Sequence, residues 1–344
     1  MTAGLRLVRD AELGARNSFR VAARAPLLLD VERLDVLGEA LELAGDSAPL
    51  LLGGGSNLLF AGDAPGAVLS LRAQALSILD DAGSHALVRA EAGAQWHAFV
   101  RWTLDQGLCG LENLALIPGT VGAAPIQNIG AYGVEAGELV HAVEIFDPAA
   151  GAVRRLPAAE CGFAYRDSVF KRGGQGWIVT AVEFALPRQA APRIGYAGLR
   201  EALQAAGASA PTPMQVFETV CAVRRSKLPD PATVGNAGSF FKNPVLPLDA
   251  ARALADAHPG LPLYPGADAG SRKLPAAWLI EACGWKGHRD GDAGVSERHA
   301  LVLVNHGAAS GAQLLALARR IACSVSERFG VALEPEPGIV GARW

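Results

Sequence analysis

Apolar residues recur along the chain in short continuous runs and in longer helical patterns. Three short apolar runs predict buried strands at 27–31, 49–52 and 68–71. Between the first two, Leu34, Leu37 and Leu41 stand at helical spacing and predict a helix over 32–44. Strands and a helix in this order are typical of a β-α-β-like unit.

The rest of the chain mixes strands with amphipathic helices, an α+β pattern. Apolar runs and alternation predict strands at 76–80, 86–92, 142–147, 152–156, 177–185 and 300–304. Helical spacing predicts helices at 95–106, 199–206, 214–226, 248–257, 276–283 and 312–329. We expect an irregular lead-in over 1–26 and an alternating, strand-like tail over 331–336.

One segment, 117–133, is both irregular and uncharged. It contains four glycines and two prolines, which rule out long regular structure, and it lies in a stretch without charge between Glu112 and Glu135. Backbone polar groups in such an apolar segment need partners inside the fold. A flat, heteroatom-rich ligand would supply them; a cluster of structural turns around a core is the alternative.

A second glycine loop, 53–57, follows the predicted strand at 49–52 and has the sequence Gly-Gly-Gly-Ser-Asn. Such a loop can present backbone N–H groups to phosphate. It does not fit the dinucleotide-binding pattern, because Leu58 stands where that pattern requires glycine. The loop is therefore a phosphate-cradle candidate of another kind, with a plain tight turn as the alternative.

The length of the chain bears on the number of domains, and its net charge bears on the kind of partner it binds. A chain of 344 residues is too long for one ordinary core, so we expect two or three domains. The break at 228–231, Leu-Pro-Asp-Pro, is a candidate boundary, and an irregular polar stretch at 235–244 follows it. The net charge of −3 gives no basic footprint, so no nucleic-acid partner is expected.

The cysteines, the histidines and the lengths of the apolar runs argue against disulfides, a metal site and a membrane span. The five cysteines are odd in number and never spaced as Cys-x-x-Cys, which argues for a reducing compartment. The histidines show no metal-binding spacing, so no metal is expected. No apolar run approaches the roughly 18 residues of a membrane span, so no membrane insertion is expected.

Three residues outside the glycine loops could carry chemistry. Ser239 is not in a Gly-x-Ser-x-Gly elbow, so hydrolase chemistry fits poorly and a structural turn is the plain alternative. Arg166 beside Asp167 could be a local ion pair. Glu336 lies between two prolines in an apolar setting, where a carboxylate is either edge-exposed or held by a partner.

Six segments, in this order, resemble the UDP-N-acetylenolpyruvoylglucosamine reductase family of bacterial peptidoglycan synthesis. The matching segments are 53–57, 117–133, 165–171, 227–231, 235–244 and 333–336. Tyr196, ahead of the predicted helix at 199–206, looks like the substrate-covering tyrosine of the longer of the family's two types.

The resemblance implies an α+β fold of three domains. The first two would form an FAD-binding fold of the vanillyl-alcohol-oxidase and p-cresol-methylhydroxylase type, and the third an α/β substrate-binding domain. Domain one would comprise 1–70 and 330–344, domain two 71–226, and domain three 227–329.

The resemblance also implies a non-covalent FAD, with NADPH as the hydride donor. The residues carried over as cofactor-binding are Gly53, Gly54, Gly55, Ser56, Asn57, Pro118, Gly119, Thr120, Gly122, Ala123, Gln127, Asn128, Gly130, Ala131, Tyr132 and Gly133.

The implied reaction reduces UDP-N-acetylglucosamine enolpyruvate to UDP-N-acetylmuramate in cell-wall synthesis. Hydride passes from NADPH to the flavin N5 and then to C3 of the enol ether. By resemblance Ser239 protonates C2, while Arg166 and Glu336 stabilise the enolate-like intermediate. The residues matched to the substrate pocket are Tyr165, Tyr196, Lys227 and Asn243. A cytoplasmic monomer is expected.

The chain departs from the family after Glu336, where Pro337 and Gly338 replace an apolar residue and an arginine. Proline cannot donate to a sheet ladder, so we expect the chain to bend there. Two other functions stay open on the sequence. One is a flavin oxidase or dehydrogenase of the same fold acting on another substrate. The other is a nucleotide-sugar or flavin binding module without turnover.

Overall fold

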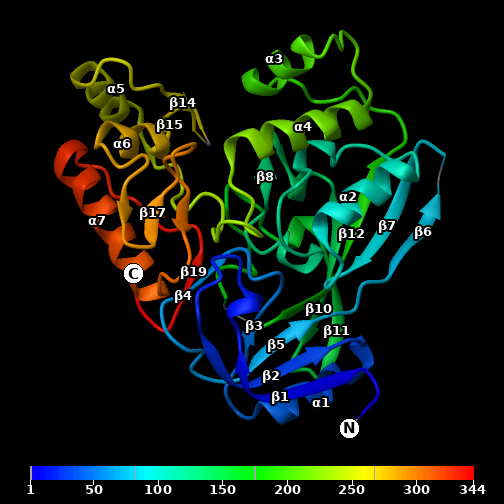
Figure 1. Cartoon of the computed structure of the whole chain (residues 1–344). Helices are drawn as coiled ribbons and strands as arrows, with labels where there is room; N and C mark the ends of the chain where they lie inside the picture. The colour runs from blue at the N-terminus through cyan, green and yellow to red at the C-terminus, as the bar shows by residue number, and fades with distance from the viewer. Residues whose placement is uncertain (1, 82, 174–175, 267) are drawn as a thin grey trace. The chain divides into compact units, whose positions relative to one another are not determined.

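The structure is a computed structural model of the chain that describes residues 2–81, 83–173, 176–266 and 268–344 (Figure 1). The chain forms two compact units. Unit 1 comprises Met1–Ala11, Ala25–Gly54 and Gly66–Ser226, and unit 2 comprises Glu12–Arg24, Gly55–Pro65 and Lys227–Trp344. Each unit therefore contains segments that lie far apart in the sequence.

A small sheet and one helix form the first layer of unit 1. Its strand order is β1 (Leu5–Glu12), β2 (Arg24–Val31), β5 (Val68–Leu71), β3 (Leu50–Leu51). Strands β2 and β3 both run parallel to β5, as a β-α-β-like unit requires. Helix α1 (Leu37–Ala44) buries Leu37 and Ala40 in a core with Leu29, Val31 and Leu69 of the sheet.

A five-stranded antiparallel sheet forms the larger part of unit 1. Its order is β11 (Ala152–Pro157), β10 (Val140–Asp147), β12 (Ile178–Pro187), β7 (His85–Glu91), β6 (Leu76–Asp81). The central strand β12 is buried along most of its length, while the edge strands β6 and β11 are largely exposed. Helices α2 (Trp96–Asp105) and α4 (Pro213–Lys227) share one core with this sheet (Figure 1).

Aromatic rings fix this core. Trp96 of α2 packs against Phe99 and against Phe184 of β12 with ring centroids 5.8 and 6.0 Å apart. Helix α4 stacks on α2 through Phe217 and His97, whose ring centroids lie 5.1 Å apart. Helix α3 (Ala197–Ala205) adds Leu199 and Leu203 to the same core. The segment 117–133 is part of this unit, with the short strands β8 (Gly130–Ala131) and β9 (Val134–Glu135) at its end.

Unit 2 is built around the long helix α7 (Gly311–Phe329). Ser310 caps its N-terminus in a capping box with Gln313, and Gly330 ends it in a left-handed conformation. The helix packs against β17 (Ala293–Val295) and β18 (Leu303–Asn305), which form a sheet with β16 (Arg289–Asp290).

Shorter elements complete unit 2. Helices α5 (Leu248–Ala257) and α6 (Ala276–Ala282) accompany a second small sheet of β13 (Val245–Pro247), β15 (Ser271–Lys273) and β14 (Tyr264–Pro265). Near the C-terminus, β19 (Gly338–Val340) pairs in parallel with β4 (Leu58–Phe60).

Three expectations about elements are wrong. The lead-in over 1–26 contains β1 and the start of β2, because an edge strand with mixed burial shows no clear alternation in its sequence. The tail over 331–336 is not a regular strand; the strand begins at Gly338. The strand expected at 300–304 begins only at Leu303, because Val302 donates to the carbonyl of His299 in a turn.

Candidate functional site

The two glycine segments of unit 1 touch through their backbones. A Cβ atom built at Gly54 would lie 2.8 Å from the Cα of Gly119, and one built at Gly53 would lie 2.9 Å from the Oγ1 of Thr120. Both distances are shorter than real Cβ contacts, so only glycine permits this approach. The loop after β3 and the start of 117–133 therefore form one local structure.

Backbone donors at this contact lack protein partners. Within the described residues, the N–H groups of Gly53, Gly54, Gly119 and Thr120 donate to no protein acceptor. Gly53 and Gly54 are also exposed, so a ligand can reach them. Adjacent unpaired N–H groups on glycine loops form a site for phosphate oxygens. This donor set fits the diphosphate of a dinucleotide cofactor.

The other end of the segment is held by its own side chains. The Asn128 side chain donates to the Oε2 of Glu135 at 2.8 Å and to the carbonyl of Ala164 at 3.1 Å, and its Oδ1 accepts the N–H of Gly137 at 2.8 Å. Asn128 and Tyr132 both have positive φ angles, of 44° and 50°. The Asn128 side-chain amide thus links the segment to Glu135, Gly137 and Ala164 and holds its end in place.

Arg166 lies beside this end of the glycine segment. Its Nη2 donates to the carbonyl of Gly130 at 3.0 Å, and its guanidinium stacks over the ring of Tyr165 at 5.4 Å. Lys171 donates to the carbonyl of Arg166 at 2.9 Å. Arg166 itself has a φ of 52°. This conformation is uncommon for a non-glycine residue, and the residues that adopt it cluster at functional sites. The fold therefore brings Tyr165 and Arg166 to the edge of the glycine segment.

Tyr196 also meets the segment. Its ring contacts that of Tyr132 edge-on, with centroids 5.2 Å apart, while half of Tyr196 stays exposed. Burial raises the pKa of the Tyr132 hydroxyl. An exposed tyrosine that rests on a half-buried one can cover a ligand on this face.

In unit 2, Ser239 lies in an extended stretch between two other segments. Ser239 forms an isolated antiparallel bridge with Val302, and Phe241 forms one with Pro335. Phe240 and Phe241 are both buried, and their rings contact each other edge-on with centroids 5.1 Å apart, so their packing holds the backbone next to the serine. Within the part of the chain that the structure describes, the Ser239 hydroxyl has no hydrogen-bond partner. It can therefore donate to a ligand.

Glu336 follows the same ladder. Its N–H donates to the carbonyl of Phe240 at 2.7 Å, and its carbonyl accepts the side chain of Asn57 at 3.4 Å. The chain bends at Glu336 and Pro337 before β19 begins, as expected from the proline. The structure thus brings Glu336 and Ser239 onto neighbouring segments of unit 2.

Lys227 and Asn243 occupy different surroundings in unit 2. Asn243 accepts the N–H of Ala276, the first residue of α6, at 2.9 Å, which leaves its amide nitrogen for a ligand. Lys227 is exposed at the end of α4. The nearby Lys242 is paired with Glu334 at 2.8 Å.

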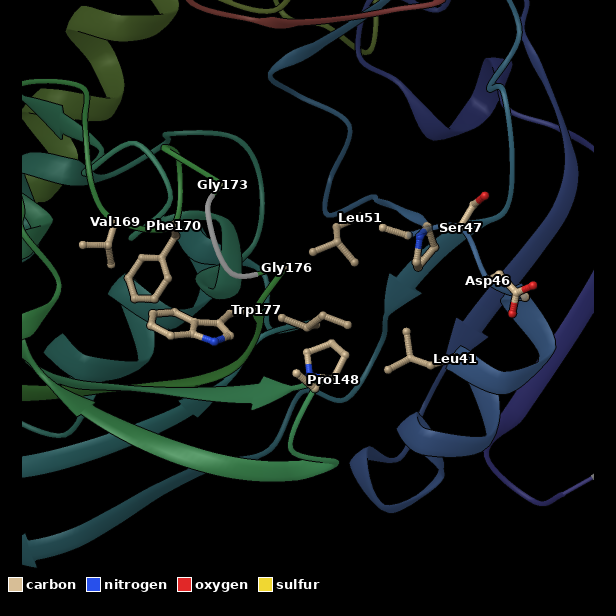
Figure 2. Close-up of a pocket in the computed structure, with 15 residues that line it drawn as sticks. Leu41, Asp46, Ser47, Leu51, Pro148, Val169, Phe170, Gly173, Gly176 and Trp177 are labelled. Atoms are coloured by element: carbon tan, nitrogen blue, oxygen red, sulfur yellow. The ribbon is translucent and has the colours of Figure 1, made fainter.

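A separate apolar pocket of about 510 Å³ opens in unit 1 (Figure 2). Leu41, Leu51, Phe170 and Trp177 line it, and Asp46 is the one ionisable side chain among its described lining residues. None of the residues predicted as a site lines this pocket. Its lining offers little for acid–base chemistry.

The described residues contain no group of histidine, cysteine, aspartate or glutamate side chains that could hold a metal ion. Among the same residues, no helix is long and apolar enough to cross a membrane.

Two family models match the chain. Residues 230–340 match the C-terminal domain of UDP-N-acetylenolpyruvoylglucosamine reductase, and residues 32–157 match an FAD binding domain. The matched ranges contain Ser239 and Glu336 in the first case and both glycine segments in the second. The matches thus cover most of the residues predicted as a site.

Whole proteins also match along nearly the full chain. The chain is 55% identical to a UDP-N-acetylenolpyruvoylglucosamine reductase from Xanthomonas euvesicatoria pv. vesicatoria, over 99% of this chain and 98% of that protein. It is 54% identical to one from Xylella fastidiosa, over 97% and 96%. A crystal structure of the reductase from Thermus caldophilus superimposes with a TM-score of 0.68 at 27% identity, covering 98% of both chains.

Proposed function

The chain belongs to the UDP-N-acetylenolpyruvoylglucosamine reductase family, and from this membership we propose which of its residues carry out the reaction. It is an FAD-dependent oxidoreductase of peptidoglycan synthesis that uses NADPH to reduce the enolpyruvyl nucleotide. Its fold combines an FAD-binding part with a C-terminal substrate-binding part. The single observation that carries this conclusion is full-length identity of 55% to a reductase of this activity.

The residues at the glycine contact fit FAD. The unpaired N–H groups of Gly53, Gly54, Gly119 and Thr120 would hold its diphosphate, and 128–133 would lie beside its ring. FAD held there would supply the hydride chemistry that links NADPH to C3 of the enolpyruvyl group. The other predicted cofactor residues stay assigned to the same cofactor: Gly55, Ser56, Asn57, Pro118, Gly122, Ala123 and Gln127.

We assign the proton for C2 to Ser239. Its hydroxyl is available, and buried Phe240 and Phe241 hold its backbone. A serine hydroxyl is a weak acid, but an enolate-like carbon is a strong base, so the transfer is downhill. The hydride at C3 and the proton at C2 together saturate the double bond. A positioned acid contributes typically 10²- to 10⁴-fold in rate.

Charged groups complete the reaction. Arg166 would fork onto the substrate carboxylate with two parallel N–H donors, where negative charge develops as C3 is reduced. Glu336 would hydrogen-bond the enolate-like intermediate. Tyr165, Tyr196, Lys227 and Asn243 would bind the substrate, with Lys227 and Asn243 supplying donors suited to its diphosphate.

We also propose the domain limits, the oligomeric state and the cellular location of the protein. The domain limits would be 1–70 with 330–344, 71–226, and 227–329. The protein would act as a monomer. It would work in the cytoplasm, where NADPH and a uridine nucleotide substrate are available.

The experiment that tests the function separates the two half-reactions. The purified protein should be yellow, and NADPH should bleach it in the absence of oxygen. The enolpyruvyl nucleotide should then restore the colour anaerobically. Colour that returns only with oxygen would indicate an oxidase, and a colourless protein without FAD affinity would indicate a binding module.

A further inference from the structure

Asn113 is a buried side chain that holds two segments of unit 1 together. Only 1% of it is exposed. Its Nδ2 donates to the carbonyl of Tyr132 at 3.0 Å and to the carbonyl of Arg193 at 2.7 Å. Within the described residues its buried Oδ1 has no partner, so the two donor bonds orient the amide. Asn113 thus joins the end of the glycine segment 117–133 to the loop that precedes α3.

That loop carries Tyr196, which lies between two fixed points of the chain. After Tyr196, helix α3 begins: the N–H of Leu199 donates to the carbonyl of Tyr196 at 3.0 Å, and the Leu199 side chain is buried in the core of unit 1. Before Tyr196, the carbonyl of Arg193 is held by Asn113. Because residues 194 and 195 alone separate these two points, the bond from Asn113 limits where the tyrosine ring can lie.

The same amide also fixes the residue on which Tyr196 rests. Tyr132 has a φ of 50°, and a bulky residue keeps such a conformation only where its surroundings hold it. Asn113 holds its carbonyl, and the Tyr132 ring meets that of Tyr196 edge-on with centroids 5.2 Å apart. The two tyrosines are therefore linked twice, once through their rings and once through their backbones by way of Asn113.

An ion pair ties the same loop at a second point, but more weakly. The Arg193 side chain pairs with Glu138, and these side chains are 55% and 39% exposed. Exposed ion pairs contribute little to stability and are screened by salt. The bonds of Asn113 are made by a neutral, buried amide, and a hydrogen bond is electrostatically stronger in the protein interior than in water. Asn113 is therefore the main restraint on the loop.

We propose that Asn113 is a positioning residue for Tyr196, which it holds in the place suited to covering the substrate before the substrate arrives. This inference rests on the proposed function, in which Tyr196 covers the enolpyruvyl nucleotide. A loop that is ordered beforehand loses less conformational entropy when the ligand binds, so the affinity is higher. Asn113 acts through Tyr196 and does not contact the substrate.

The test measures the Kd of the enolpyruvyl nucleotide for the oxidised holoenzyme by isothermal titration calorimetry. We expect Asn113→Ala to raise the Kd about tenfold, which is about 1.4 kcal/mol. The matched control is Arg193→Gln, which removes the ion pair but keeps the carbonyl that Asn113 holds, and its Kd should stay within about twofold of wild type because exposed pairs contribute little.

A double-mutant cycle separates positioning from a general effect on the fold. In a Tyr196→Ala background, Asn113→Ala should change the Kd by less than about twofold, because its effect passes through the tyrosine. Without nucleotide, Asn113→Ala should also speed hydrogen exchange of the amides between residues 193 and 200, since the loop is then less restrained.

Three outcomes would overturn the proposal. One is a wild-type Kd in Asn113→Ala, and another is an equal loss of affinity with and without Tyr196. The third is a loss in Arg193→Gln as large as that in Asn113→Ala, which would assign the restraint to the ion pair. If Asn113→Ala does not hold FAD, Asn113→Leu, which leaves less empty volume, replaces it in the cycle; if neither variant holds FAD, Asn113 supports the cofactor and the proposal is rejected. The proposed function fails separately, if wild-type enzyme reduced by NADPH is not reoxidised by the enolpyruvyl nucleotide.

Discussion

The backbone N–H of Glu336 donates to the carbonyl of Phe240, the residue after Ser239, at 2.7 Å. On the same ladder, the N–H of Lys242 donates to the carbonyl of Glu334 at 3.0 Å. These bonds place Glu336 beside the segment of Ser239 before the chain bends at Pro337. The proline therefore falls just outside the paired residues, and the loss of its N–H does not disturb them.

Glu336→Gln should impair substrate reduction and spare the reaction with NADPH. The amide keeps the size and hydrogen-bonding capacity of the side chain but cannot carry charge or exchange a proton. We expect reoxidation by the enolpyruvyl nucleotide to slow on the order of 10²-fold, as when an electrostatic group of a transition state is removed. Stopped-flow absorbance of the flavin measures both half-reactions. Glu334→Gln is the control, because Glu334 is exposed and paired with Lys242; equal losses in the two variants would refute the role of Glu336.

Ser239→Ala should separate the half-reactions still more clearly. The hydroxyl has no partner within the described residues, so its removal leaves no donor or acceptor unsatisfied. We expect flavin reduction by NADPH to stay within twofold of wild type, while substrate reduction falls by about 10²- to 10⁴-fold. Anaerobic single-turnover kinetics check this. If both half-reactions fell together, Ser239 would instead support the fold or the cofactor.

The helices were largely predictable because each has an apolar stripe that packs on a sheet. The range expected for α5 is the one observed, α6 and α7 differ by one residue at one end, and α2 differs by one residue at each end. The strand β1 and, apart from β18, the two- and three-residue strands of unit 2 were missed. Their pairing depends on partners distant in sequence, and a strand of three residues has no measurable alternation.

The site was predictable where it depends on glycine. The sequence marked 53–57 and 117–133 as separate ligand-binding candidates, and the structure adds that Gly54 and Gly119 touch. The direction of Glu336 could not be predicted from the sequence, because it depends on a main-chain hydrogen bond to Phe240, which is distant in sequence.

Arg166→Lys should reduce activity although it keeps the positive charge. A lysine cannot form the two parallel bonds of a guanidinium to a carboxylate, and it loses the stacking of Arg166 over Tyr165. We expect the second half-reaction to slow by at least tenfold, with weaker binding of the enolpyruvyl nucleotide. Arg172→Lys is the control on the same loop, where Arg172 pairs with Asp167 at 2.5 Å. Wild-type turnover in Arg166→Lys would show that Arg166 does not anchor the carboxylate.

Gly54→Ala should weaken FAD binding. The new methyl group would meet the backbone of Gly119 at 2.8 Å, and this backbone cannot yield as a flexible side chain does. The two loops must then separate, and their N–H groups no longer converge on the diphosphate. We expect at least tenfold weaker FAD binding in a fluorescence titration of the apoprotein. Gly66→Ala, at a site with no heavy atom within 4 Å of the added carbon, should bind like wild type; unchanged affinity in Gly54→Ala would reject this location.

Stability should fall in mild acid because two histidines are held neutral. Burial is the main cause that lowers the pKa of both His97 and His299, and nearby cations lower it further. The Nδ1 atoms accept N–H groups, of Leu116 at 3.0 Å and of Leu301 at 3.3 Å, which requires an unprotonated nitrogen. Below the ordinary pKa of about 6.5, the unfolded chain therefore takes up protons that the folded chain resists.

This difference makes the free energy of unfolding decrease as the pH falls from about 6.5 toward the pKa values of the folded state, whereas above 6.5 the two residues contribute no pH dependence. We expect the melting temperature of the holoenzyme to drop between pH 7.5 and pH 5.5, and to drop less in the double variant His97→Gln and His299→Gln. His141→Gln, on an exposed position of β10, serves as the control and should follow wild type. Parallel curves for wild type and the double variant would show that other groups set the acid stability.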